Sequence, residues 1–163
     1  MIVLVRIDDK LLHAQIMWGW AQALKASTVV IANDKAAGDE LRKGCLMMAV
    51  KGSESPENHP VVKILHLEEA VNMIKNLDDK TERTILVVSK PADLLFLMGK
   101  GISIKNVSVG WMSSRPDREN ILQTISVDKN DIQAFRRLSQ KGVNLTYQRS
   151  PSDTGENMMD YIN

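Results

Sequence analysis

The chain has 163 residues, an apolar fraction of 44% and a charged fraction of 25%, which suit one globular domain over residues 1–163. Its net charge of +1 argues against a nucleic-acid-binding protein with a dominant basic field. No apolar stretch approaches the roughly 20 residues that span a bilayer, no signal-peptide pattern is present, and the single Cys45 excludes a disulfide framework, so a cytoplasmic location is the default expectation.

Apolar, β-prone runs alternate with helix-like segments along the sequence. The runs predict strands at residues 2–5, 28–31, 61–65, 84–88, 104–109, 121–127 and 143–148. The segments between them predict helices at residues 14–25, 35–50, 67–74, 91–98 and 128–140. This alternation predicts an α/β fold, with an open, twisted, mainly parallel sheet and helices on both faces.

Apolar side chains in two further places are expected to pack against the rest of the protein. In the helix at residues 35–50, the buried stripe is expected to consist of Leu41, Cys45, Met47 and Met48. In the polar tail at residues 150–163, the candidate docking groups are Met158, Met159 and Tyr161.

His13 lies where the first strand gives way to a helix. In an open α/β sheet this position faces the crevice at the carboxyl ends of the strands, near the positive end of a helix dipole. A neutral imidazole there can act as a nucleophile and receive a phosphoryl group. Arg6 and Lys10 flank it and are expected to add mobile positive charge that binds phosphate. A structural histidine that packs against Trp20 is the less favoured interpretation.

Other polar residues at the ends of predicted strands are expected to share this crevice. Asp8 and Asp9 are expected to shape the loop and to orient His13 or Arg6. Ser89 either donates its hydroxyl to phosphate or caps the helix that follows it. The rim on which a partner docks is expected to include Asp34, Gly110 and Trp111.

The other two histidines are expected to take no part in chemistry. His59 lies in a polar loop and is expected to be exposed to solvent, whereas His66 is expected to cap the helix after the third strand. Because the three histidines lack the spacing of metal ligands, no metal site is predicted.

Residues 6–20 resemble the phosphorylation-site signature of the enzyme IIB components of the mannose/fructose/sorbose family of the sugar phosphotransferase system. The matching positions are Arg6, Ile7, Asp8, Asp9, Leu11, His13, Gln15 and Trp20. The positions that differ from the family pattern, here and near residue 110, are Lys10, Leu12, Ala14, Ile16, Ser108 and Trp111. The resemblance implies an open sheet of about seven strands, mostly parallel with one antiparallel edge.

The same resemblance implies a phosphocarrier that needs no cofactor. It would accept a phosphoryl group on His13 from a phosphohistidine of a cognate IIA domain. It would then pass the group to a sugar bound by membrane IIC and IID subunits, at the inner face of the cell membrane. Arg6, Asp8, Asp9, Lys10 and Ser89 would bind phosphate or shape the site.

Two other functions remain open from the sequence. The same fold could serve as a phosphorylation-dependent regulatory or docking module, because the substitutions at positions 10, 14, 108 and 111 change the surroundings of His13. A mononucleotide-binding protein is a weaker alternative, because no glycine-rich loop follows the first strand. The identity of the sugar and the reactive nitrogen of His13 are not encoded in any motif.

Overall fold

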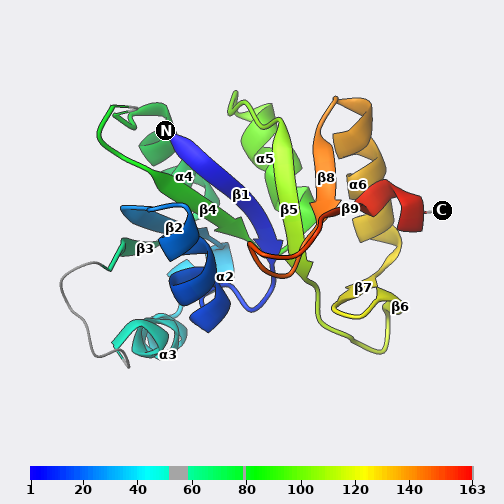
Figure 1. Cartoon of the computed structure of the whole chain (residues 1–163), viewed down its shortest axis with the longest axis horizontal. Coiled ribbons are helices and arrows are strands. Elements are labelled where there is room, and N and C mark those ends of the chain that lie inside the picture. The colour runs from blue at the N-terminus through cyan, green and yellow to red at the C-terminus, as the bar shows by residue number, and fades with distance from the viewer. Residues whose placement is uncertain (52–58, 79, 163) are drawn as a thin grey trace.

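The computed structural model describes residues 1–51, 59–78 and 80–162. Its main sheet has, within these residues, seven strands in the order β3-β2-β4-β1-β5-β8-β9 (Figure 1). The strands are β1 (Ile2–Asp8), β2 (Thr28–Ala32), β3 (Val61–Leu65), β4 (Thr84–Val88), β5 (Asn106–Trp111), β8 (Asn144–Tyr147) and β9 (Glu156–Asn157). All neighbouring pairs are parallel except β8 and β9. The predicted α/β sheet with one antiparallel edge is confirmed.

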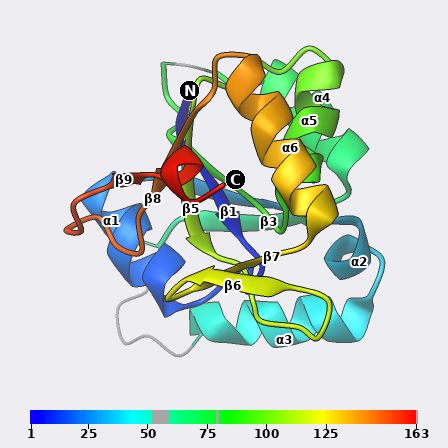
Figure 2. The same ribbon diagram turned by 90° about the vertical axis from the view of Figure 1, so that its right-hand side faces the viewer.

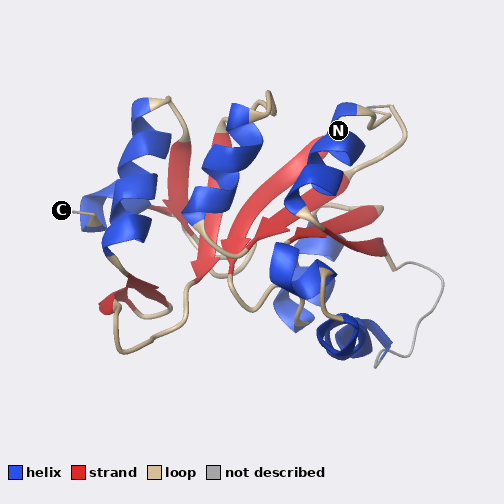
Figure 3. Cartoon of the chain, turned by 180° about the vertical axis from the view of Figure 1, so that it is seen from behind, coloured by secondary structure: helices blue, strands red, loops and turns tan. Residues whose placement is uncertain are grey.

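Helices cover both faces of the sheet, and each face has its own apolar core. The helices α4 (Leu67–Lys75), α5 (Pro91–Gly99) and α6 (Lys129–Gln140) lie side by side on one face (Figure 3). The other face is covered by a π-helix (Gln15–Trp20), by α1 (Ala21–Ala23) and by α2 (Asp34–Ala37). Along β2, Val30 contributes to the first core and Val29 to the second. Strands buried on both faces are apolar along nearly their whole length, which explains the apolar runs that follow Thr28 in β2 and Thr84 in β4.

The predicted helix at residues 35–50 is wrong in two respects. It is divided into α2 and α3 (Glu40–Lys51), and the Asp39 carboxylate accepts the Arg42 N–H at the start of α3. The predicted buried stripe is also largely exposed, because Leu41 and Met48 are 79% and 70% accessible to solvent. The physical reason is position: α3 lies along the lower edge of the molecule in Figure 2, where only part of its surface meets the second core.

Two further segments differ from the sequence prediction. Residues 121–127 form a hairpin of β6 (Glu119–Leu122) and β7 (Ile125–Val127), which is a separate antiparallel sheet rather than one strand of the main sheet. The seventh strand of the main sheet comes instead from the tail, where β9 precedes a short 3₁₀ helix (Met158–Tyr161). Met158 is fully buried and Met159 packs against the first core, as expected, whereas Tyr161 is only half-buried and donates its hydroxyl to Glu156.

The first strand also extends further than its apolar run, through Asp8 instead of ending at Val5. A charged residue argues against a buried strand, but here Arg6 and Asp8 are both buried and paired with each other. No helix among the described residues is long and apolar enough to cross a membrane.

We predict that Met158→Ala lowers the free energy of unfolding by about 2–5 kcal/mol, because it removes a buried side chain and leaves a cavity. Urea denaturation followed by circular dichroism measures this change. Met48→Ala is the matched control, and its effect should stay within about 0.5 kcal/mol because that side chain is exposed. Equal effects of the two variants would show that the tail does not contribute to the core.

Candidate active site

A strained loop carries His13 from the end of β1 into the first turn of the π-helix. Leu11 adopts φ of 61°, a left-handed conformation that is rare for a bulky residue, and its N–H donates to the Asp8 carbonyl. Burial of the Leu11 and Leu12 side chains in the second core holds this conformation. The His13 carbonyl accepts the N–H groups of Ile16 and Met17, so the imidazole stands at the helix start.

Asp8 fixes the orientation of the His13 ring. Its carboxylate is fully buried, and its Oδ2 lies 2.9 Å from His13 Nε2 and 3.2 Å from Arg6 Nε. Its Oδ1 accepts the Lys10 N–H. Because a carboxylate only accepts hydrogen bonds, Nε2 carries a proton, and in the neutral imidazole Nδ1 then keeps its lone pair. Nδ1 has no hydrogen-bond partner among the described residues, and the His13 side chain is 27% exposed. The expectation that Asp8 orients His13 matches this geometry.

Arg6 is a buried side chain held by hydrogen bonds, and not the mobile cation that the sequence predicted. Its guanidinium is 2% exposed and donates to Asp8, to Ser108 Oγ at 2.8 Å, and to the carbonyls of Gln148 and Arg149 at 2.8 and 3.1 Å. Burial lowers the pKa of the Arg6 guanidinium, and the Asp8 carboxylate opposes that change. Through these contacts the side chain joins β1 to β5 and to the segment after β8.

Gly110 is buried beneath this guanidinium and therefore cannot belong to a docking rim. A Cβ at this position would lie 1.8 Å from Arg6 Nη2 and 2.1 Å from Arg6 Cζ. The glycine is thus required by the close approach of a side chain and not by backbone conformation.

Lys10 and Trp111 form a pair at the exposed edge of the site. The Lys10 ammonium lies 3.4 Å from the centroid of the Trp111 ring, in the geometry of a cation–π interaction. Lys10 is exposed and Trp111 is half-buried. Lys10 and Trp111, two of the residues that differ from the family signature, therefore contact each other. The assignment of Trp111 to a docking rim stays a prediction.

Asp9 anchors the loop to a distant part of the chain. Its carboxylate accepts the N–H and hydroxyl of Ser113, each at 2.7 Å, and it pairs with Arg118 at 3.3 Å. Arg118 is 5% exposed and also pairs with Asp131 at the start of α6. No local sequence pattern marks Ser113 or Arg118 as site residues, because they contact a residue more than 100 positions away in the chain.

The expected single crevice is only partly formed. Asp34 and Ser89 do lie at the carboxyl edge, where they line a pocket of about 310 Å³ together with Asp9. His13 and Gly110 are not part of that lining. Ser89 accepts the Asn33 amide at 3.0 Å and donates to Asp93.

The other two histidines, His59 and His66, contact neighbouring side chains of the protein framework. His66 begins α4, and its N–H donates to Glu69, as predicted for a cap. The expectation that His59 is exposed is wrong, because its ring packs edge-on against Trp18 with centroids 4.7 Å apart. Across the described residues there is no group of three side chains that could hold a metal ion.

Comparison with known proteins decides the family. The model of PTS system sorbose subfamily IIB components, where PTS is the phosphotransferase system, matches residues 2–163. The chain belongs to this family of IIB components. It is 33% identical to the sorbose-specific EIIB component of Klebsiella pneumoniae, covering 99% of this chain and 95% of the relative. It is 32% identical to the fructose-specific EIIB component of Bacillus subtilis, with the same coverage.

Solved structures agree with this assignment. The IIB domain of the sorbose permease from Klebsiella pneumoniae superposes with a TM-score of 0.89, covering 100% of this chain and 96% of that domain.

A further relative by sequence is longer than this chain. The mannose-specific EIIAB component of Escherichia coli is 30% identical, and this chain spans 48% of its length. The IIB component is therefore a sugar phosphotransferase domain, and the resemblance noted in residues 6–20 is confirmed.

We predict that Gly110→Ala destabilises the IIB component by about 1–3 kcal/mol, because the new methyl group displaces a guanidinium held by four acceptors. Urea denaturation measures the change. Gly99→Ala is the control, since a Cβ there meets nothing within 4 Å. A neutral effect at position 110 would mean that the Arg6 network yields at little cost.

Proposed function

We propose that this IIB component is a phosphocarrier in which His13 Nδ1 accepts a phosphoryl group from a phosphohistidine of a IIA domain. The carrying observation is the 2.9 Å contact between His13 Nε2 and Asp8. It fixes the tautomer so that the nitrogen with the lone pair is the one without a partner among the described residues.

The transfer needs positioning and charge stabilisation more than proton movement. The P–N bond of the donor breaks, and its electron pair returns to the donor imidazole. The lone pair of His13 Nδ1 forms the new P–N bond while Nε2 keeps its proton. The product ring then carries positive charge, which the buried Asp8 carboxylate offsets.

In the second transfer, a sugar hydroxyl oxygen attacks the phosphoryl group. The P–N electron pair returns to Nδ1, neutral His13 is regenerated, and the hydroxyl proton passes to solvent. Lys10, an exposed residue of the His13 loop, supplies the point charge for the phosphoryl oxygens in both steps.

The partners follow from the same proposal. A mannose-specific relative carries the name EIIAB, which supports a IIA domain as the donor. The acceptor is a sugar held by membrane IIC and IID subunits, so the protein acts in the cytoplasm, bound peripherally to the inner membrane face. Arg6, Asp8 and Asp9 shape the site, while Trp111 and Asp34 lie on the side that meets partners.

We predict that incubation with phosphorylated IIA adds one phosphate to the wild-type chain, detected by intact-mass spectrometry, and adds none to His13→Ala. Phosphorus–nitrogen couplings in NMR spectra of the ¹⁵N-labelled product should assign the phosphate to Nδ1. His66→Ala is the control, because this exposed side chain lies outside the loop. Undiminished labelling of His13→Ala would refute the proposal, and labelling at Nε2 would refute the role given to Asp8.

We also predict that Lys10→Glu slows phosphoryl acceptance at least about tenfold at low salt, because it replaces an attractive charge by a repulsive one. Lys10→Arg should match or exceed the wild-type rate. Rapid-quench labelling measures both rates, and the wild-type rate should fall as salt rises. Lys105→Glu, an exposed position before β5 at the opposite edge of the sheet, is the control. A Lys10→Glu variant as fast as wild type would make Lys10 an ordinary surface cation.

A further inference from the structure

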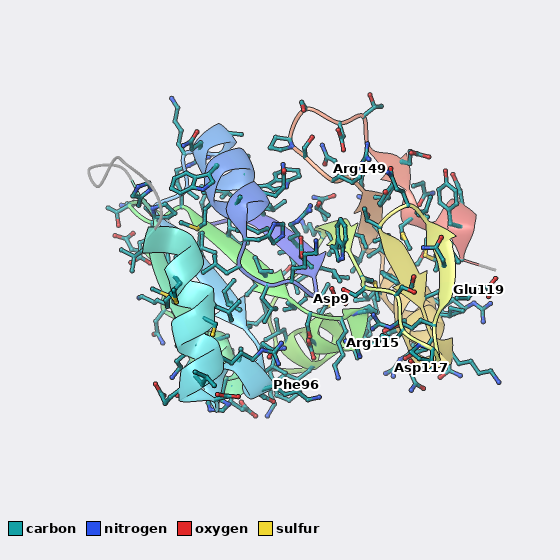
Figure 4. All side chains as sticks on the ribbon, turned by 90° about the horizontal axis from the view of Figure 1, so that it is seen from below. Asp9, Phe96, Arg115, Asp117, Glu119 and Arg149 are labelled. Carbon is teal, nitrogen blue, oxygen red and sulfur yellow. The ribbon has the colours of Figure 1, made fainter. Side chains whose placement is uncertain are left out.

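A second concave site lies beside the His13 loop, on the other side of Asp9. Its volume is about 310 Å³, and Figure 4 shows Asp9 and Arg115 near the middle of the carboxyl edge. Three carboxylates line it, Asp9, Asp34 and Asp93. Each of them accepts a hydrogen bond from the protein, from Ser113, the Leu67 N–H and Ser89 respectively.

Most of the cations that line this pocket, in contrast to the carboxylates, have no hydrogen-bond or ion-pair partner within the described part of the protein. No hydrogen bond or ion pair within the described part of the chain involves the side chains of Lys35, Arg42, Lys90 and Arg115. A fifth cation, Arg118, is 5% exposed and keeps a buried Nε without a partner. The five cations of the described lining outnumber its three carboxylates, so its net charge is positive.

Two further features bear on the charge of this pocket. The helix α5 begins at Pro91 beside the pocket, so its positive dipole end faces the same region as Lys90. Asp93 is nearly fully buried, and desolvation raises the pKa of its carboxyl group against the opposing effect of Lys90. The dipole end of α5 therefore favours an anion here, whereas the raised pKa of Asp93 shows only that burial disfavours the charge of that carboxylate.

We propose that this pocket binds the phosphate monoester of a small polyhydroxylated compound, at a site separate from His13 and in addition to the phosphocarrier role. Its volume is at the lower end of the roughly 300–1,000 Å³ typical of ligand pockets and exceeds the needs of a bare phosphate ion. Phosphate oxygens meet the lysine and arginine side chains.

The rest of the lining suits hydroxyl groups. Asp34 Oδ1 accepts the Leu67 N–H, whereas Oδ2 has no partner among the described residues and can accept from a hydroxyl. Asn33 and Ser89 add polar surface, and Leu67 is the single apolar side chain in the described lining. A hydrocarbon ligand does not fit such a wall, whereas a polyol does.

The site also touches the catalytic loop. Asp9 lines the pocket and directly follows Asp8, the residue that holds His13. A bound ester is therefore in contact with the segment that positions the nucleophile, although it does not contact the nucleophile itself.

The test is a titration of the full ¹⁵N-labelled chain with fructose 1-phosphate, fructose and inorganic phosphate, followed by amide chemical shifts. We expect saturable shifts at residues 33–35, 89–93 and 113–118 with the ester, weaker binding of inorganic phosphate at the same amides, and no saturation with fructose. His13→Ala should bind the ester unchanged, which separates this site from phosphoryl transfer. Shifts confined to the His13 loop, or equal affinity for ester and inorganic phosphate, would overturn the proposal.

Charge-removing variants complete the test. The double variant Lys35→Gln, Arg115→Gln should bind the ester about tenfold more weakly, because two charge-assisted contacts are lost. Lys105→Gln, on the opposite edge, should bind like wild type. Undiminished binding by the double variant overturns the assignment, whereas loss of His13 labelling with intact ester binding would count against the phosphocarrier role alone.

Discussion

The buried pair of Arg6 and Asp8 is the constraint on which the rest of the site depends. Both side chains are shielded from solvent, and removing one partner from such a pair typically costs about 3–5 kcal/mol because the other charge is left uncompensated. Asp8 uses the same oxygen for Arg6 and for His13, so the imidazole is oriented by a group that is itself held in place. The His13 imidazole is thus positioned by the protein interior, although it is partly exposed.

The pair also explains why distant parts of the chain are arranged as they are. Arg6 needs acceptors from β5 and from the segment after β8, and Gly110 provides the space for its guanidinium. The next residue, Asp9, holds two distant residues in a similar way, by a hydrogen bond from Ser113 and an ion pair with Arg118. Two consecutive carboxylates therefore fasten the loop, Asp8 to Arg6 and Asp9, through Arg118, to the start of α6.

Local patterns predicted those features that depend on neighbouring residues. The alternation of apolar runs and helices predicted the parallel sheet correctly, since strands buried on both faces are apolar along nearly their whole length. Residues 6–20 indicated His13 and the family. The prediction that Arg6 is a mobile cation was wrong, because the solvent exposure of a side chain is not set by its neighbours in sequence. Arg6 is buried because its hydrogen-bond acceptors include Ser108, which is more than 100 positions away in the chain.

The sequence by itself determined the fold class and the family and pointed to His13 as the proposed nucleophile, because the hydrophobic period and a contiguous motif each depend on residues close together in the chain. Only the tertiary structure decided which nitrogen of His13 is available, why Gly110 is a glycine, that Leu41, Cys45 and Met48 of α3 are exposed, and that the tail supplies the antiparallel edge strand. Each of these depends on contacts between segments brought together by folding. Burial and hydrogen-bond partners are set by that packing, and a linear pattern records neither.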